Sequence, residues 1–186
     1  MKIKSKPVIS IILLTFISIV LLISAICAKL EAKRYKDEYI RLFQAEWEYL
    51  YRMTDIIDSN FISIEDSDIS DYSLYANQVC YSYSGKTTVN SFNLEVRHFL
   101  IFVYDMYFKI LSNDKYDYEI AKNNLGTMNS EFQDFCKKII NEKPDWILKE
   151  KSQKYINYTN EIKELGNKYE IILNAIVQDG NSKDSN

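Results

Sequence analysis

VISIILLTFISIVLLISAICA, residues 8–28, is the stretch that decides the fold, and it contains no charged side chain. As an α-helix, this stretch would span roughly 31 Å at about 1.5 Å per residue, close to the hydrocarbon thickness of a bilayer. Backbone amides in lipid must be hydrogen-bonded within the segment, so a helix is the expected form. The stretch is therefore predicted to be a transmembrane anchor.

Two other interpretations of this stretch stay open, a cleaved signal peptide and a lipoprotein signal. A cleaved signal has an apolar core of about 7–15 residues and a small-x-small cleavage site. Here the run is longer, and the candidate sites near Ala28 lack a good small residue or carry Ile26 in a small-residue position. A lipoprotein signal would acylate Cys27, but Ile26 again stands where a small residue is needed. The sequence favours an uncleaved anchor.

Basic residues on the two sides of the anchor predict its orientation. Lys2, Lys4 and Lys6 precede it without any acid, whereas residues 29–38 mix four basic and three acidic residues. Basic flanks stay in the cytoplasm, so residues 1–7 are expected inside and residues 29–178 outside the cell membrane. The sequence has no second apolar run of this length, which predicts a single crossing.

The part of the chain after the anchor is acidic and long enough for one domain with a core. Four of the 23 basic residues and none of the 26 acidic residues precede residue 30, so residues 30–186 have a net charge of −7. This balance argues against a nucleic-acid partner, which would require a basic footprint. Four glycines and two prolines disfavour a multi-turn all-β fold, and the Lys-, Asn-, Ile- and Tyr-rich composition suggests a bacterial source.

Apolar residues recur at helical spacing, three and four residues apart, in four segments after the anchor. The stripes are Ile40, Phe43, Trp47, Leu50, Thr54 and Ile57; Val89, Phe92, Val96, Phe99, Val103, Met106 and Ile110; Ala121, Leu125, Met128, Phe132, Phe135 and Ile139; and Tyr155, Tyr158, Ile162, Leu165, Tyr169, Ile172 and Ile176. The period predicts an all-α chain in which a single transmembrane helix precedes an antiparallel four-helix bundle. Its helices are expected at about 30–58, 88–112, 115–142 and 145–178.

The segments between these stripes contain helix-ending residues. Ser112-Asn113-Asp114 and Lys143-Pro144-Asp145 are suited to end one helix and begin the next, whereas Gly126 could kink the helix at 115–142. Nothing breaks the pattern after Ala28, so the anchor and the first bundle helix could form one rod. Residues 179–186 are polar and are expected to be disordered.

The long connection from Ser59 to Thr88 has an acidic first half and a tyrosine-rich second half, in which residues 72–83 are expected to form a short helix. Long connections in compact domains are often functional, and tyrosine combines an apolar ring with a polar tip. Tyr72, Tyr75, Tyr81 and Tyr83 are therefore the predicted interaction surface.

Cysteine and histidine residues are the candidates for disulfide, metal and catalytic roles. Cys80 and Cys136 could form a disulfide in an extracytoplasmic domain, the alternative being two free thiols. Glu95-Val96-Arg97-His98 matches one half of a di-iron motif, but His98 is the single histidine. No nucleophile–base signature and no phosphate-binding glycine loop is present in the sequence. We expect no catalytic, metal or cofactor-binding residues.

Together these features predict a membrane-anchored, non-catalytic helical interaction module, such as an accessory, sensor or immunity-type subunit. The architecture is similar to the ligand-binding part of chemoreceptors and some sensor kinases, but this chain lacks their second span and signalling region. The expected partners are the bilayer and an envelope or membrane protein, and the first bundle helix could pair with a second copy to form a homodimer. The alternatives are a secreted helical protein after signal cleavage and a metal-binding or enzymatic four-helix bundle.

Overall fold

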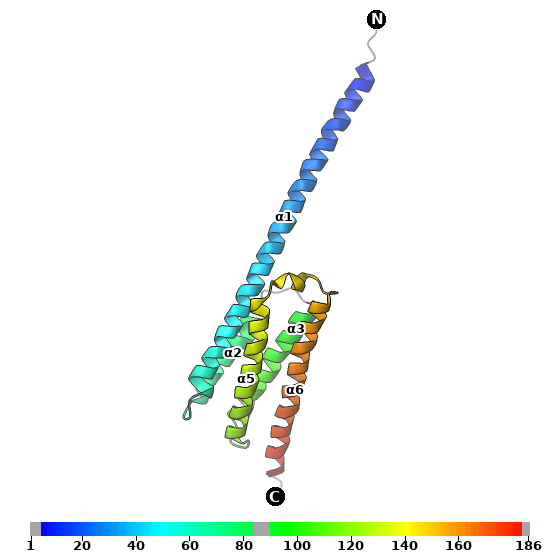
Figure 1. The fold of residues 1–186 in the computed structure, drawn as a ribbon. Helices are drawn as coiled ribbons and strands as arrows, with labels where there is room; N and C mark the ends of the chain where they lie inside the picture. The colour runs from blue at the N-terminus through cyan, green and yellow to red at the C-terminus, as the bar shows by residue number, and fades with distance from the viewer. Residues whose placement is uncertain (1–4, 84–89, 184–186) are drawn as a thin grey trace. The chain divides into compact units, whose positions relative to one another are not determined.

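The computed structural model describes residues 5–83 and 90–183, and the described chain is all-helical, without β-strands (Figure 1). This confirms the predicted all-α class. The chain divides into two units, Met1–Leu42 and Phe43–Asn186, which are described separately below.

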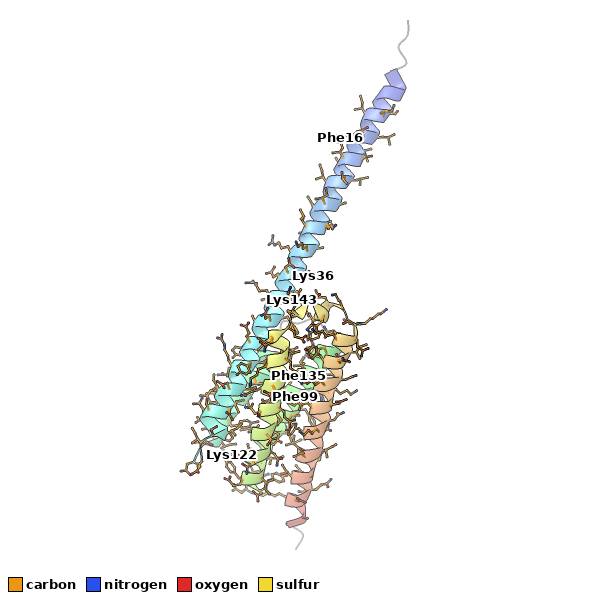
Figure 2. All side chains as sticks on the ribbon, viewed as in Figure 1. Phe16, Lys36, Phe99, Lys122, Phe135 and Lys143 are labelled. Atoms are coloured by element: carbon orange, nitrogen blue, oxygen red, sulfur yellow. The ribbon has the colours of Figure 1, made fainter. Side chains whose placement is uncertain are left out.

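The first unit is the N-terminal part of a long helix, α1 (Ser5–Ile57), which begins just before the apolar stretch and continues past Ala28 without a break. Every residue from 10 to 38 is exposed, including Phe16, which is labelled in Figure 2 and is 64% exposed. Within the described chain, α1 is the one helix long and apolar enough to cross a membrane. The expectation of a long apolar N-terminal helix is confirmed.

The second unit contains the remainder of α1 and the other helices of the chain. A π-helical turn, η1 (Asp58–Ile62), ends α1 and is followed by α2 (Ile69–Ser82), which confirms the expected short helix in the long connection. The later elements are α3 (Ser91–His98), the π-helix η2 (Phe99–Tyr104), α4 (Asp105–Leu111), α5 (Tyr118–Asn141), the 3-10 turn η3 (Pro144–Leu148) and α6 (Gln153–Lys183).

Short polar side chains begin three of these helices by accepting hydrogen bonds from free backbone N–H groups. Asp68 accepts from the amide of Ser70 before α2, at 2.9 Å. Asn90 caps α3 and Asp117 caps α5 in the same way. The side-chain oxygen of each accepts a hydrogen bond from the backbone amide three residues later. Such caps satisfy amides that have no partner within the helix.

The helix predicted at 88–112 is interrupted by a π-helix. Its first residues and Val89 of the stripe lie outside the described residues, and the helical path then runs through α3, η2 and α4. The π-helical turn is wider, and the adjacent pairs Phe99–Leu100 and Val103–Tyr104 are all buried. The predicted stripe places Met106 inward, but Tyr107 is the buried residue there.

The last helix begins later and ends later than its predicted bounds of 145–178. Lys143 has the extended backbone expected before proline, but Pro144 opens the 3-10 turn η3, and α6 starts at Gln153. Residues 179–183, which were expected to be disordered, belong to α6. The Tyr116 ring packs directly on Gly180. It leaves no room for a larger side chain there, because a Cβ atom at position 180 would lie 2.4 Å from Tyr116 Cδ1. Gly126 lies inside α5, and it does not interrupt the helix.

The core of the second unit is built from aromatic rings on several elements. Trp47 of α1 packs on Phe135 of α5 with ring centroids 5.6 Å apart, and Phe43 lies 5.8 Å from Trp146 of η3. Trp146 also packs on Tyr158 of α6, with ring centroids 4.7 Å apart and the ring planes tilted by 38°. Figure 2 labels Phe135 within this core. Ring contacts therefore join the start of the unit to residues far along the chain.

Candidate interaction surface

Buried hydrogen bonds fix the elements that surround the candidate surface. Asn129 of α5 is fully buried, and its Nδ2 donates to the carbonyl of Thr54 in α1 at 2.8 Å. Its Oδ1 accepts from the hydroxyl of Tyr104 at the same distance. The Tyr104 carbonyl in turn accepts from the hydroxyl of Tyr72 in α2, also at 2.8 Å. This chain of bonds joins α1, α5, η2 and α2, and it holds α2 against η2.

A groove of about 360 Å³ lies between α2 and the helical path of η2 and α4. Ala76, Cys80 and Phe108 are among its apolar lining residues. Ile101 and Tyr81 also line the groove and are exposed, with exposed fractions of 46% and 72%. The groove therefore presents apolar side chains to the surroundings of the protein.

The charge and thiol within the groove have defined neighbours. Asp105 forms an ion pair with Lys109 one turn later in α4, with 2.6 Å between Oδ2 and Nζ, and the Asp105 side chain is about half exposed. The Sγ atom of Cys80 lies 3.0 Å from the Leu100 carbonyl, to which it donates a hydrogen bond. Burial, and secondarily the Asp105 carboxylate, raises the pKa of the Cys80 thiol to about 12. Cys80 is therefore a packing residue, since nucleophilic chemistry requires the thiolate.

The structure separates the four tyrosines that the sequence grouped as one interaction surface. Tyr72 and Tyr83 are in the core, 0% and 1% exposed, with their hydroxyls bonded to the Tyr104 carbonyl and to Asn93 Oδ1. Tyr75 is half-buried, and Tyr81 is exposed at the groove. The correction is that only Tyr75 and Tyr81 of the four have surface to offer. Tyr72, on the inner face of α2, and Tyr83, which directly follows α2, pack into the core.

The possible disulfide between Cys80 and Cys136 is not formed. Both residues, and Cys27, are free thiols. Cys136 is fully buried in α5, where burial raises the pKa of its thiol. Of the two alternatives that the sequence left open, the structure has free thiols.

The half-motif around His98 gathers no further metal ligands. Within residues 5–83 and 90–183, no group of three or more His, Cys, Asp or Glu side chains is placed to hold a metal ion. His98 is exposed and stacks on Phe102, the residue one turn later, with ring centroids 5.3 Å apart.

Sequence reasoning missed two features of the second unit. The first is the η2 side of the groove. The run from Phe99 to Tyr104 is apolar on every face of the helix, so some of its apolar residues must face outward. This pattern could have indicated an exposed apolar surface.

The second missed feature is Lys122 of α5, which is 5% exposed. Its Nζ donates to the Ile64 carbonyl and, at 3.0 Å, to Ser67 Oγ, and it lies 5.3 Å from the centre of the Phe61 ring. Lys122 thus clamps the loop between η1 and α2. No local pattern marks a lysine for such a role.

Comparisons with known proteins add no family to this description. No family model matches the chain, and no curated protein and no solved structure is similar enough to count as a match.

Proposed function

We propose that this protein is a single-pass membrane protein whose second unit is a non-catalytic interaction module outside the cytoplasmic membrane. The observation that carries the proposal is the apolar part of α1, whose most apolar 18-residue window is 0% buried. An exposed apolar surface of this size on a helix of this length is stable in lipid and costly in water. Lys2, Lys4 and Lys6 support an N-terminus in the cytoplasm.

The finer architecture that we propose for the second unit is an antiparallel four-helix bundle with α2 added to its side. The four members are the second part of α1, the path of α3, η2 and α4, then α5, and then α6. Ring contacts between these members support this arrangement, because Phe92 of α3 packs on Phe135 of α5 at 6.4 Å and Phe135 packs on Tyr158 of α6 at 6.0 Å. Short connections favour neighbours that run in opposite directions.

The groove along α2 is the surface that we propose for the partner. The occupant would be an apolar segment of another membrane or envelope protein, with basic residues at its edge. Apolar residues such as Ile101 and Tyr81 would be buried by it, and the net charge of −7 on residues 30–186 complements a basic rim. Aromatic and aliphatic side chains at the centre of an interface carry most of its binding free energy.

The first experiment tests membrane topology. Cells expressing the full chain with an epitope after Asn186 are converted to protoplasts and treated with external protease. We expect full-length protein in the membrane fraction and loss of the epitope. A protected epitope would place the second unit in the cytoplasm. A shorter, soluble product would establish the cleaved, secreted alternative, and its intact mass would locate the cleavage site.

The second experiment tests the groove in living cells. A photo-crosslinking amino acid is placed at Tyr81 or Ile101, with Ile171 of α6 as the matched control, since Ile171 is 70% exposed and Tyr81 is 72% exposed. We expect one defined adduct from both groove positions and none from Ile171. The adduct at Tyr81 should disappear when Ile101→Lys is added, with helicity unchanged. Adducts of equal yield from all three positions, or an adduct insensitive to Ile101→Lys, would refute the proposal that the groove binds the partner.

A further inference from the structure

Three lysines form a stripe on α1 directly after its apolar stretch. They are Lys29, Lys33 and Lys36, and we call them the lysine stripe. Their spacings of four and three residues place them within about 60° of one another around the helix axis. All three residues are exposed, and Figure 2 labels Lys36 on this part of α1. The lysine stripe is therefore a positively charged face of the first unit.

Acidic residues of the same segment lie mostly away from this face. Glu31 and Glu38 are on the opposite side of α1, roughly 180° from the middle of the stripe. Asp37 is closer, and it follows the middle lysine by one turn. Lys29 and Lys36 have no acidic residue three or four positions away, where an intrahelical ion pair could form. Most of the charge of the stripe is therefore unbalanced on its own helix.

The rest of the described chain does not neutralise the lysine stripe either. Within residues 5–83 and 90–183, none of its lysines takes part in a salt bridge or a cation–π contact. Lys33 is about one turn from both Lys29 and Lys36, and like charges at this spacing destabilise a helix. A negatively charged group lying against the stripe would offset this repulsion.

The place of the stripe along α1 indicates the source of that negative charge. With residues 8–28 in the hydrocarbon layer, Lys36 would lie roughly 12 Å beyond its edge, at about 1.5 Å per residue. The polar headgroup layer is about 5–8 Å deep on each side of a bilayer. Cα–Cβ bonds tilt toward the N-terminus of a helix, which for α1 is the end in the lipid. The lysine side chains would therefore lean back toward the headgroups, and Lys29 and Lys33 would lie among them.

We propose that the lysine stripe binds the phosphate groups of anionic phospholipids in the leaflet on the side of the second unit. The proposal rests on the proposed membrane anchor, which brings the stripe to that leaflet. A lysine near an anionic membrane surface gains about fivefold in affinity for it, and its ammonium group binds phosphate as a point charge. Residues 30–186 have a net charge of −7 even with two of these lysines included, so the stripe is a local exception on an acidic chain.

The matched control is the basic residue next to the middle of the stripe. Lys33 and Arg34 are adjacent, so they lie at the same depth, and both are exposed. They point about 100° apart around the axis. Three acidic residues, Glu31, Asp37 and Glu38, are three or four positions from Arg34, so its charge is balanced within the helix. Lys33→Gln is therefore compared with Arg34→Gln.

The test uses the full chain in phosphatidylcholine vesicles that contain a minority of either photoactivatable phosphatidylglycerol or photoactivatable phosphatidylcholine. After illumination, mass spectrometry counts adducts on residues 29–41 separately from those on residues 1–7, which contain the lysines of the other flank. On residues 29–41, we expect more adducts with phosphatidylglycerol than with phosphatidylcholine. Lys33→Gln should lower this ratio about fivefold and Arg34→Gln less than about twofold. Lys33→Arg, which keeps the charge, should leave the ratio unchanged.

Three results would overturn the proposal. The first is a ratio near one for the unaltered chain, and the second is an equal loss in Lys33→Gln and Arg34→Gln. The third concerns the source of the phosphate. Inorganic phosphate added at constant ionic strength should leave the ratio unchanged, and loss of the ratio would show a site for free phosphate rather than for lipid.

Flotation of the same vesicles separates this proposal from the proposed anchor. Protein that floats with the vesicles but shows no lipid preference would refute the lysine stripe and leave the anchor standing. Protein that does not float would refute both.

Discussion

Asn129→Leu is expected to lower the free energy of unfolding by about 3 kcal/mol. The substitution keeps a similar shape but leaves the buried Tyr104 hydroxyl and the Thr54 carbonyl without Asn129, to which each is bonded at 2.8 Å. A buried polar group that loses its partner costs about 1–3 kcal/mol, and we assign about 2 to the hydroxyl and about 1 to the carbonyl. With a urea m-value of about 1.5 kcal/mol/M, the midpoint should fall by about 2 M.

Tryptophan fluorescence of the full chain in mild detergent is a suitable assay, because the two tryptophans, Trp47 and Trp146, are both buried in the second unit. The sharper test adds Tyr104→Phe to Asn129→Leu, which removes the stranded hydroxyl. The double variant should then be more stable than Asn129→Leu alone by about 1–2 kcal/mol. Additive losses from the two substitutions would show that the bond does not contribute as argued.

Three further predictions concern the second unit. Lys122→Met should cost about 1–3 kcal/mol, because it leaves the acceptors of the η1–α2 loop without a donor, and limited proteolysis should then cut that loop faster. Cys80 and Cys136 should react with maleimide at pH 8 only after urea unfolding, because burial raises the pKa of both thiols. The hydrogen bond from Lys154 lowers the pKa of Glu142, against the opposing effect of burial. The ionised Glu142 carboxylate therefore stabilises the fold at pH values above its unfolded pKa of about 4.3. This stabilisation is lost as the pH falls through the lower pKa of the folded state. Lys154→Met should therefore reduce the loss of stability between pH 5 and pH 3.

Matched controls accompany these three predictions. Lys137→Met removes an exposed ion pair with Asp134 and should change the free energy of unfolding by less than about 1 kcal/mol. A loss of stability as large as that of Lys122→Met would contradict the proposed contribution of the buried Lys122 hydrogen bonds. If Cys80 and Cys136 react with maleimide in the native protein as fast as they do in urea, burial does not protect these two thiols. An unchanged acid slope in Lys154→Met would contradict the role of the Glu142 pair.

The helices could be predicted from the sequence because apolar periodicity and capping residues are local signals. Phe92, Val96 and Phe99 lie on the predicted stripe and are buried. The π-helix η2 was not predictable in this way, because it changes which residues face inward without changing the composition. For the same reason, Tyr107 replaces Met106 at the inner face.

The candidate surface was predictable only in part. The spacing of Tyr72, Ala76, Val79 and Tyr83 already marks the inner face of α2, since these residues are four, three and four positions apart and all are buried. That periodicity could have separated Tyr72 and Tyr83 from Tyr81. The other wall of the groove comes from η2 and α4, and which residues oppose α2 depends on tertiary packing that no local pattern encodes.

The contact of Phe43 with Trp146 has a consequence for synthesis on the ribosome. Phe43 is the first residue of the second unit, and it leaves the ribosome long before Trp146. Until Trp146 has emerged, the inner face of α1 lacks part of its packing surface, and long-range contacts of this kind slow folding. A nascent chain stalled before residue 146 should therefore present Phe43 and Trp47 to chaperones, and release from them should coincide with emergence of η3 and the start of α6.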